Sequence, residues 1–328
     1  MKILFAIQGT GNGHISRARE IVPLLKEYGH VDILVSGTQA DLTLDYTLKH
    51  KFHGFSFIFG KRGGVNHWKT YQSMNLPQLW RDAKSLPLSN YDLVINDFEP
   101  ITSWACKFAG KPVVALSHQC SFLSNKSPRP AGSYHWHEFV FKHYAPATHL
   151  VGLHFEKYDD FINTPIIRKE IREQHLQDLG HITVYLPAYD DIYLIKYLKE
   201  ITDVRWEVFS KHTNRIYQDG NVYVQPIDHF KYNKSLASSW GLLTGGGFEG
   251  PAEALFMGKR VLVIPMKHQY EQQCNAESLR KIGVQIVKHI DSNFVATLKQ
   301  WLFNSGIIKV DFKDETSTIV HNLITKFS

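Results

Sequence analysis

Two stretches of this sequence combine glycines with side chains that could do chemistry. The first runs from Thr244 to Ala276 and reads TGGGFEGPAEALFMGKRVLVIPMKHQYEQQCNA. Its glycines at 245–247 follow a short apolar run and allow the backbone to approach a ligand closely. A helix is predicted to begin at Glu249, with Pro251 in its first turn, where proline costs no hydrogen bond. The exposed amides at such a helix start favour an anion such as a diphosphate.

The same stretch then predicts a strand that is buried on both faces, Arg260 to Ile264, which stops at Pro265. Open α/β sheets bind their ligands at the carboxyl edge of the strands. The loop over residues 268–272 is therefore expected to emerge at a ligand site. The three glycines alone favour nothing more than a tight strand-to-helix turn, and the functional interpretation depends on the whole stretch.

The second stretch lies at the start of the chain, where the predicted strand Lys2 to Ile7 runs into glycines at 9, 11 and 13 and then His14. A helix is predicted from Ile15 to about residue 28. A dinucleotide site is disfavoured, because the glycines do not have the G-x-G-x-x-G spacing and the second strand ends in Ser36 rather than in a ribose-binding acid.

Together these residues resemble the donor site of the GT-B glycosyltransferases. The shared pattern is Gly247, Glu253 six positions later, Pro265, and Glu271-Gln272-x-x-Asn275-Ala276. Within that family the pattern resembles the lipid II N-acetylglucosaminyltransferases and the UDP-glucuronosyltransferases. The resemblance implies an α/β protein with two Rossmann-like domains whose parallel sheets face a central cleft.

The resemblance also implies roles for the donor-site residues. The glycine loop would face the diphosphate, Glu253 the ribose, and the pair Glu271 and Gln272 the sugar hydroxyls, whose hydrogen bonds carboxylate and amide oxygens accept. Arg168 would contact the diphosphate or, alternatively, would be a solvated linker arginine. The predicted donor-binding residues are Gly11, Gly13, Arg168, Ile227, Thr244, Gly245, Gly246, Gly247, Phe248, Glu249, Glu253, His268, Gln269, Glu271, Gln272 and Asn275.

By the same resemblance, the glycine loop before His14 faces the acceptor and the donor phosphates. His14 is then the candidate general base, since an imidazole titrates near neutral pH; the alternative is a structural hydrogen bond to a neighbouring loop. Asp97 ends a predicted strand and is the candidate partner of His14. Glu99 or His118 could serve instead, and Asp97 could simply cap a helix.

The acceptor side is less defined by the sequence. His118 and Trp68 are the candidate acceptor-side residues. Two basic, aromatic stretches marked by glycine or proline, residues 60–68 and 121–133, suit an acceptor pocket, although surface loops without a chemical role would look the same.

The 328 residues predict two domains. The first is expected over residues 1–163, an interdomain linker over 164–180, and a nucleotide-sugar-binding domain over 181–328. Apolar residues at helical spacing near the C-terminus predict an amphipathic helix over about 316–328, which could pack back on the first domain.

Composition limits the partners that can be expected. Three scattered cysteines indicate neither a disulfide framework nor a zinc site, and no cofactor or metal is expected. The net charge of +6 favours anionic ligands or anionic lipid headgroups, whereas the dispersed basic residues do not indicate nucleic acid. The expected partners are a nucleotide-sugar donor and a glycan or lipid-linked acceptor, in a cytoplasmic protein that could contact the inner face of a membrane.

The sequence thus predicts an inverting, metal-independent glycosyltransferase that uses a UDP-sugar, with a role in cell-envelope glycan synthesis. Two alternatives stay open. One is a UDP-sugar hydrolase of the same fold, because residues 11–17 read GNGHISR, which also resembles nucleotide-sugar hydrolases. The other is a nucleotide-sugar-binding subunit of a transferase complex.

Overall fold

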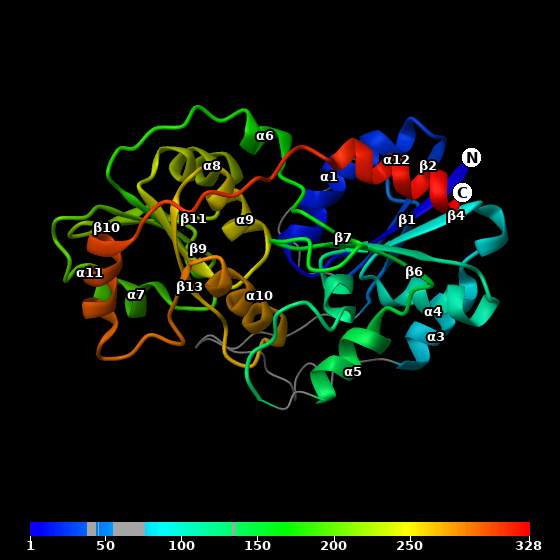
Figure 1. Ribbon diagram of the computed structural model, residues 1–328, viewed down its shortest axis with the longest axis horizontal. Coiled ribbons are helices and arrows are strands. Elements are labelled where there is room, and N and C mark those ends of the chain that lie inside the picture. The colour runs from blue at the N-terminus through cyan, green and yellow to red at the C-terminus, as the bar shows by residue number, and fades with distance from the viewer. Residues whose placement is uncertain (38–43, 45, 55–75, 133–134) are drawn as a thin grey trace.

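The computed structural model describes residues 1–37, 44, 46–54, 76–132 and 135–328, which form two α/β halves that lie side by side (Figure 1). Each half contains a seven-stranded sheet, ordered β3-β2-β1-β4-β5-β6-β7 in the first and β10-β11-β9-β8-β12-β13-β14 in the second. Within the described chain, the strand pairs are parallel except for the edge pair of β10 and β11. Two parallel sheets with alternating helices confirm the predicted fold class.

Apolar strands form the centre of the first sheet. Along β1, Ile3, Phe5 and Ile7 pack into one apolar cluster, whereas Leu4 and Ala6 pack into another on the opposite face. Such burial on both faces is why this strand is a continuous apolar run. The elements of this half are β1 (Lys2–Gln8), α1 (Asn12–Lys26), β2 (His30–Ser36), β3 (His50–Phe52), α3 (Leu76–Ser85), η1 (Leu88–Asn90), β4 (Leu93–Asp97), α4 (Pro100–Ala109), β5 (Val114–Ser117), η2 (Gln119–Leu123), α5 (His135–Tyr144), β6 (His149–Leu153) and β7 (Ile162–Asn163).

The second sheet has a core of its own, in which Trp206 and Trp301 are fully buried. The short helix α6 (Lys169–Arg172) lies on the chain between the two sheets. The remaining elements are β8 (Ile182–Tyr185), α7 (Asp191–Leu198), β9 (Trp206–Ser210), β10 (Tyr217–Asp219), β11 (Val222–Pro226), α8 (His229–Ser238), β12 (Gly241–Gly245), α9 (Glu249–Phe256), β13 (Arg260–Ile264), α10 (Tyr270–Lys281), β14 (Gln285–Ile286), α11 (Phe294–Asn304) and α12 (Thr316–Phe327).

The chain returns to the first half at its C-terminal end. An extended segment after α11 crosses to the other half, where α12 lies beside α1 (Figure 1). Ile319, Val320 and Leu323 of α12 are buried, and Tyr28 Oη lies 3.0 Å from Nδ1 of His321. The last helix therefore ties the second half of the chain to the first.

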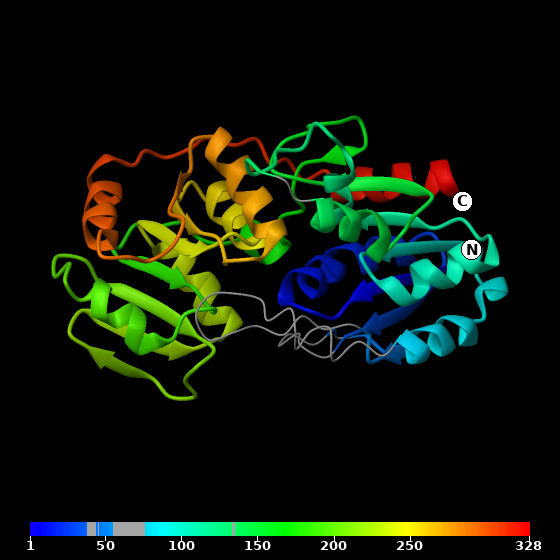
Figure 2. The same cartoon turned by 90° about the horizontal axis from the view of Figure 1, so that it is seen from below.

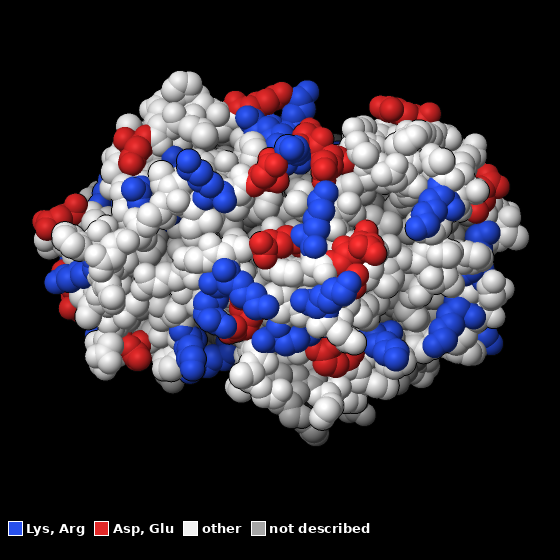
Figure 3. Space-filling model, viewed as in Figure 1, with Lys and Arg blue, Asp and Glu red and all other residues white. Residues whose placement is uncertain are grey.

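Strand order places ligand-binding crevices where the two halves meet. In the first sheet the order reverses between β1 and β4, and in the second between β8 and β12. Loops at the carboxyl ends of strands on either side of such a reversal form the ligand crevice of open α/β sheets. Figure 2 shows the two halves side by side from below, and Figure 3 shows basic and acidic side chains interspersed over their junction.

Candidate active site

A histidine and an aspartate meet at the strand-order reversal of the first sheet. His14 lies in the first turn of α1, and Asp97 is the last residue of β4. Nδ1 of His14 lies 2.9 Å from Oδ1 of Asp97, and both residues are buried. When the Nδ1–H group of His14 donates a hydrogen bond to Asp97, Nε2 of His14 keeps its lone pair. This atom faces Gln119, whose Nε2 is 3.5 Å away. This is the arrangement that a histidine general base requires.

Arg17 joins this pair to the second half of the chain. Its Nε and Nη2 donate to the two carboxylate oxygens of Asp97 over 2.7–3.2 Å, and its Nη1 donates to Oε1 of Glu249 over 2.5 Å. Burial opposes ionisation of Asp97, but the charges of Arg17 and His14 outweigh it and lower the pKa of that carboxyl. The Asp97 carboxylate is therefore charged at neutral pH, as a partner that orients His14 should be.

Glu249 is the first residue of α9 and reaches across the junction between the halves. A Cβ at Gly13 would lie 3.1 Å from its Cγ, so the absence of a side chain at position 13 allows this approach. The Glu249 side chain is 19% exposed. Burial, opposed by Arg17 and reinforced by Glu253 and Asp97, raises the pKa of Glu249 to about 7. A carboxyl group that titrates near neutrality therefore stands at the start of α9.

Backbone geometry separates the roles of Asp97 and Glu99. The residue between them, Phe98, has a φ of 55°, in the left-handed region that residues other than glycine rarely adopt. The fully buried Glu99 carboxylate accepts from the backbone N–H groups of Ile101 and Thr102, at 2.8 and 2.7 Å, which makes it the N-cap of α4. We therefore assign Glu99 to helix capping and Asp97 to His14.

A cavity of about 330 Å³ opens between the start of α1 and the carboxyl edge of the second sheet. Ten of the predicted donor-binding residues line it, whereas Gly11, Gly246, His268, Gln269, Glu271 and Asn275 are not part of its described lining. The ten are Gly13, Arg168, Ile227, Thr244, Gly245, Gly247, Phe248, Glu249, Glu253 and Gln272.

The glycine loop before α9 is shaped by α10. Oε1 of Gln272 accepts from the backbone N–H groups of Gly246 and Met266, at 3.1 and 2.9 Å, and Nδ2 of Asn275 donates to the Gly246 carbonyl over 3.0 Å. A Cβ at Gly246 would lie 2.7 Å from the Gln272 carbonyl oxygen. At Gly247, by contrast, a Cβ would meet no atom of the described chain within 4 Å. Gln272 and Asn275 therefore hold the loop in shape, and Gly247 faces open space.

The three other predicted residues after β13 differ in their surroundings. Gln269 caps α10, since its Oε1 accepts from the backbone N–H of Gln272 over 2.5 Å. His268 is exposed and has a φ of 63°. The charge of the Glu271 carboxylate favours the protonated form of Arg17 and partly opposes the lowering of the His118 pKa by burial. Of the three, Glu271 is the residue whose charge acts on groups at the junction of the two halves.

Arg168 and Glu253 form a buried ion pair. Nε and Nη2 of Arg168 donate to the two carboxylate oxygens of Glu253 over 2.5 and 2.8 Å, and Nη1 also contacts Glu170 and His229. Arg168 is only 7% exposed, so the alternative of a solvated linker arginine is wrong. Its guanidinium holds the acid that was predicted to contact the ribose.

The acceptor-side candidates have different outcomes. His118 is buried at the junction, where its ring stacks on Phe248 with centroids 3.9 Å apart. Its Nδ1 and Nε2 lie 2.8 Å from the Leu153 carbonyl and from Oδ1 of Asn275, and burial lowers its pKa. His118 therefore contacts both halves, and its acceptor-side role stays a prediction. Trp68 lies outside the described residues.

Two residues of this site did not figure among the predicted ones. Arg17 stands three positions after His14, a spacing that puts both side chains on one face of α1. Gln119 follows β5, and its buried Oε1 has no hydrogen-bond partner in the described part of the chain. The helical spacing could have indicated Arg17, whereas nothing local to the sequence marks Gln119.

Solved structures share this two-domain architecture. They include UDP-bound MnaA of S. aureus (TM-score 0.64, 12% identity, covering 100% of this chain and 97% of that one). LpCGTa in complex with UDP gives a TM-score of 0.62 and 12% identity, covering 100% and 99%. MurG of Acinetobacter baumannii gives 0.54 and 13%, covering 98% and 94%. At such low identities the likeness establishes the fold, which is that of the GT-B glycosyltransferases.

Sequence comparison identifies the family. The profile of the Glycosyl transferase family 1 matches residues 1–303, and the chain therefore belongs to this family of glycosyltransferases. No curated protein matches the sequence.

Among the described helices, none has both the length and the apolar character needed to cross a membrane. Cys106, Cys120 and Cys274 are buried free thiols.

Proposed function

We propose that this protein transfers a hexosyl group from a UDP-sugar to an acceptor hydroxyl with inversion at the anomeric carbon. The observation that carries the proposal is the His14–Asp97 pair beside a cavity that the glycine loop and the start of α9 line. Membership of Glycosyl transferase family 1 supports it, as do the UDP held by MnaA and LpCGTa and the thymidine diphosphate held by SsfS6.

In this proposal the nucleoside binds near Ile227 and Glu253, which both line the cavity. Arg168 fixes the carboxylate of Glu253 by two hydrogen bonds. Each carboxylate oxygen has two lone pairs, so a ribose hydroxyl can still donate to the same group. Arg168 thus acts as a positioning residue for the nucleoside-binding acid, and no contact between Arg168 and the diphosphate is needed.

The diphosphate would lie at the glycine loop and the start of α9, where helix amides favour an anion. Glu249 stands at this position, and two like charges about 4 Å apart repel by about 4 kcal/mol at an effective dielectric constant of 20. A pKa of about 7 allows Glu249 to bind a proton at little cost when the diphosphate arrives. Nη1 of Arg17, released from Glu249, can then donate to a phosphate oxygen.

The chemical step follows from the His14 geometry. Nε2 of His14 takes the proton of the acceptor hydroxyl while that oxygen attacks the anomeric carbon from the face opposite UDP. The bond from the anomeric carbon to the diphosphate breaks, and UDP leaves with the bonding electron pair. Asp97 stabilises the imidazolium that forms. Arg17 and the α9 amides stabilise the leaving diphosphate, so the proposal includes neither a metal nor a cofactor.

The acceptor in this proposal is a glycan or a lipid-linked sugar of the cell envelope. Its hydroxyl would approach Nε2 of His14 beside Gln119, whose buried Oε1 offers an acceptor for a second hydroxyl. The basic net charge of +6 is the basis for extending the proposal to a cytoplasmic enzyme that contacts anionic lipid headgroups at the membrane.

Two variants test the division of labour. His14→Ala should abolish transfer and leave UDP affinity nearly unchanged, because His14 acts on the acceptor. Glu253→Ala should weaken UDP binding, because the ribose loses a hydrogen-bond acceptor and Arg168 loses its partner. Transfer would be followed by mass spectrometry of acceptor products, and affinity by calorimetry. An equal loss of UDP affinity in both variants would contradict these roles.

Hydrolysis of a UDP-sugar is the second candidate function. The observation that favours it is the direct contact of His14 with Arg17, which are the ends of the His-x-x-Arg pattern that resembles nucleotide-sugar hydrolases. Water would then take the place of the acceptor hydroxyl at Nε2 of His14. Steady release of UDP from a UDP-sugar without any acceptor would favour hydrolysis, whereas release that depends on an acceptor would favour transfer.

A further inference from the structure

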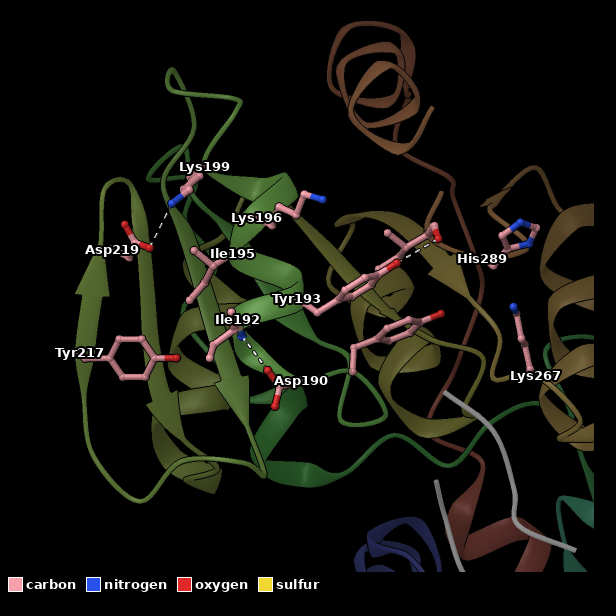
Figure 4. Close-up of a pocket in the computed structure, with 12 residues that line it drawn as sticks. Asp190, Ile192, Tyr193, Ile195, Lys196, Lys199, Tyr217, Asp219, Lys267 and His289 are labelled. Atoms are coloured by element: carbon pink, nitrogen blue, oxygen red, sulfur yellow. Dashed lines mark hydrogen bonds and ion pairs between the residues drawn. The ribbon is translucent and has the colours of Figure 1, made fainter. Parts of the chain in front are cut away.

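Two cavities share Tyr189 in their lining. The larger one, of about 1020 Å³, runs along α7, where Figure 4 shows Asp190 and Asp219 among the lysines. Asp219 pairs with Lys199 over 3.4 Å, so this groove contains both signs of charge and favours neither an anion nor a cation. The donor cavity, by contrast, contains a hydroxyl group that its own surroundings leave unpaired.

This group is the hydroxyl of Tyr232, a residue of α8 that lines the donor cavity. Its Oη is buried and has no hydrogen-bond partner in the described part of the chain. The ring is held from two sides, because it packs edge-on against the rings of Phe209 and Tyr185, with centroids 5.3 and 5.6 Å apart. An unpaired buried hydroxyl is unfavourable in the free protein, so a ligand that supplies a hydrogen-bond acceptor gains affinity there.

The first turn of α9 leaves room beside this hydroxyl. A Cβ at Gly250 would lie 3.7 Å from Oη of Tyr232 and 3.9 Å from Oγ1 of Thr244, and would meet no other described atom outside α9 within 4 Å. Thr244 already uses its proton, because Oγ1 donates to the Tyr185 backbone carbonyl over 3.1 Å. Tyr232 is therefore the hydroxyl that can donate to a ligand oxygen in the gap beside Gly250.

The position of this gap along α9 indicates which part of a nucleotide fills it. Gly250 lies directly after Glu249 at the start of the helix and one turn before Glu253, on the same face. With the ribose at Glu253 and the diphosphate at the helix start, the atoms that lie between them are those of the α-phosphate. Burial and the charge of Glu253 raise the pKa of Tyr232, so the hydroxyl keeps the proton that a phosphate oxygen would accept.

We propose that Oη of Tyr232 donates a hydrogen bond to a non-bridging oxygen of the nucleotide α-phosphate, and that this contact distinguishes nucleotides from nucleosides. The inference deepens the proposed function and rests on it, because it names a residue that recognises the donor diphosphate. Ionised carboxylates such as Glu253 can only accept hydrogen bonds, whereas a phenol donates one at neutral pH. The contact is independent of the base and of the sugar.

Tyr232→Phe removes this hydroxyl and keeps the ring. Calorimetric titration of the full chain should show UDP and UMP each binding about ten-fold or more weakly than to the wild type, because a hydrogen bond to a charged group is lost. Uridine affinity, measured by NMR titration, should be unchanged. Without nucleotide, the variant should be at least as stable in urea as the wild type, because its phenol had no partner. Tyr223→Phe, in a half-buried residue of β11 outside the described lining of the cavity, is the matched control and should bind all three ligands like the wild type.

Gly250→Ala tests the same contact from the side of α9. Its methyl group would lie at an ordinary contact distance from Tyr232, and alanine favours a helix more than glycine does, so the fold should be retained. The methyl group fills the gap, so UDP and UMP should bind more weakly while uridine is unaffected. Because both variants remove one contact, their effects on UDP affinity should not add in the double variant.

The titrations separate failure of this inference from failure of the proposed function. A wild type that does not bind UDP would overturn the proposed function, and the inference with it. When the wild type binds UDP, the inference alone is overturned by unchanged UDP affinity in Tyr232→Phe, by an equal loss of uridine affinity, or by a loss that spares UMP. Independent, additive losses in the double variant would also contradict a shared contact.

Discussion

The pKa of Glu249 predicts how UDP affinity depends on pH. Glu249 stands at the start of α9, where we propose that the diphosphate binds, and its pKa is raised to about 7. If the diphosphate binds only when this carboxyl is protonated, the apparent Kd grows as the ionised fraction grows. Raising the pH from 6 to 8 takes the ionised fraction of Glu249 from about one-tenth to about nine-tenths. The protonated fraction falls about ten-fold, which predicts a Kd about ten-fold higher at pH 8.

The matched variant is Glu249→Gln, which keeps the size of the side chain and cannot ionise. UDP itself titrates near pH 6, but its contribution is the same in the variant. The ratio of the wild-type Kd to the variant Kd therefore isolates Glu249. This ratio should rise about ten-fold between pH 6 and pH 8.

Isothermal titration calorimetry with UDP at half-unit pH steps measures that ratio. The groups that face Glu249 are Arg17 and His14 from α1, Asp97 from β4 and Glu253 from its own helix. Arg17→Lys, which retains the charge, should preserve the sign of the pH dependence. A ratio that is constant from pH 6 to pH 8, or that falls, would refute the idea that diphosphate and the Glu249 carboxylate compete.

Three further variants test the positioning of the site. Asp97→Asn should lower kcat about 100-fold or more with little change in UDP affinity, because His14 loses the partner that orients it; unchanged kcat would contradict the pairing. Arg168→Met should destabilise the fold by about 3 kcal/mol in urea unfolding and also weaken UDP binding, because the buried charge of Glu253 is left without its partner; full stability would show that the pair is unimportant. Glu99→Ala should cost about 1–2 kcal/mol as a lost helix cap while UDP affinity stays unchanged, and a selective loss of transfer without loss of stability would instead return Glu99 to catalysis.

Much of the fold could be predicted because its signals are local. The strand Arg260–Ile264 and the start of α9 at Glu249 agree with the structure residue for residue. Both depend on apolar runs, glycines and a proline that act within a few residues. The first helix begins earlier than predicted, at Asn12, because Gly11 with a φ of 100° takes the N-cap position.

The parts of the site that could not be predicted depend on contacts between distant residues. Arg168 and Glu253 are 85 positions apart, and only the fold brings them together. Likewise, nothing in the sequence near His118 shows that Phe248 of the other half stacks on its ring. A sequence pattern shows which residue types are present near an edge, whereas their partners are decided by packing across the junction.

The choice between Asp97 and Glu99 shows the same limit at short range. Two carboxylates two residues apart at a strand end look equivalent in a sequence. The left-handed φ of Phe98 and the requirement of α4 for a cap give them different partners. Backbone conformation at a single position thus decides which acid faces His14.

The most direct test of the donor site uses a residue that faces open space. A Cβ at Gly247 meets no described atom within 4 Å, and the same is true at Gly306, which is not part of the donor cavity. Calorimetric titration with UDP, with GDP, dTDP and NAD as controls, should show selective binding of UDP at one site per chain. Gly247→Val should abolish this binding without loss of fold, and Gly306→Val should retain it. Undiminished UDP affinity in Gly247→Val, or a preference of the wild type for NAD, would contradict the assignment of this cavity to a nucleotide-sugar.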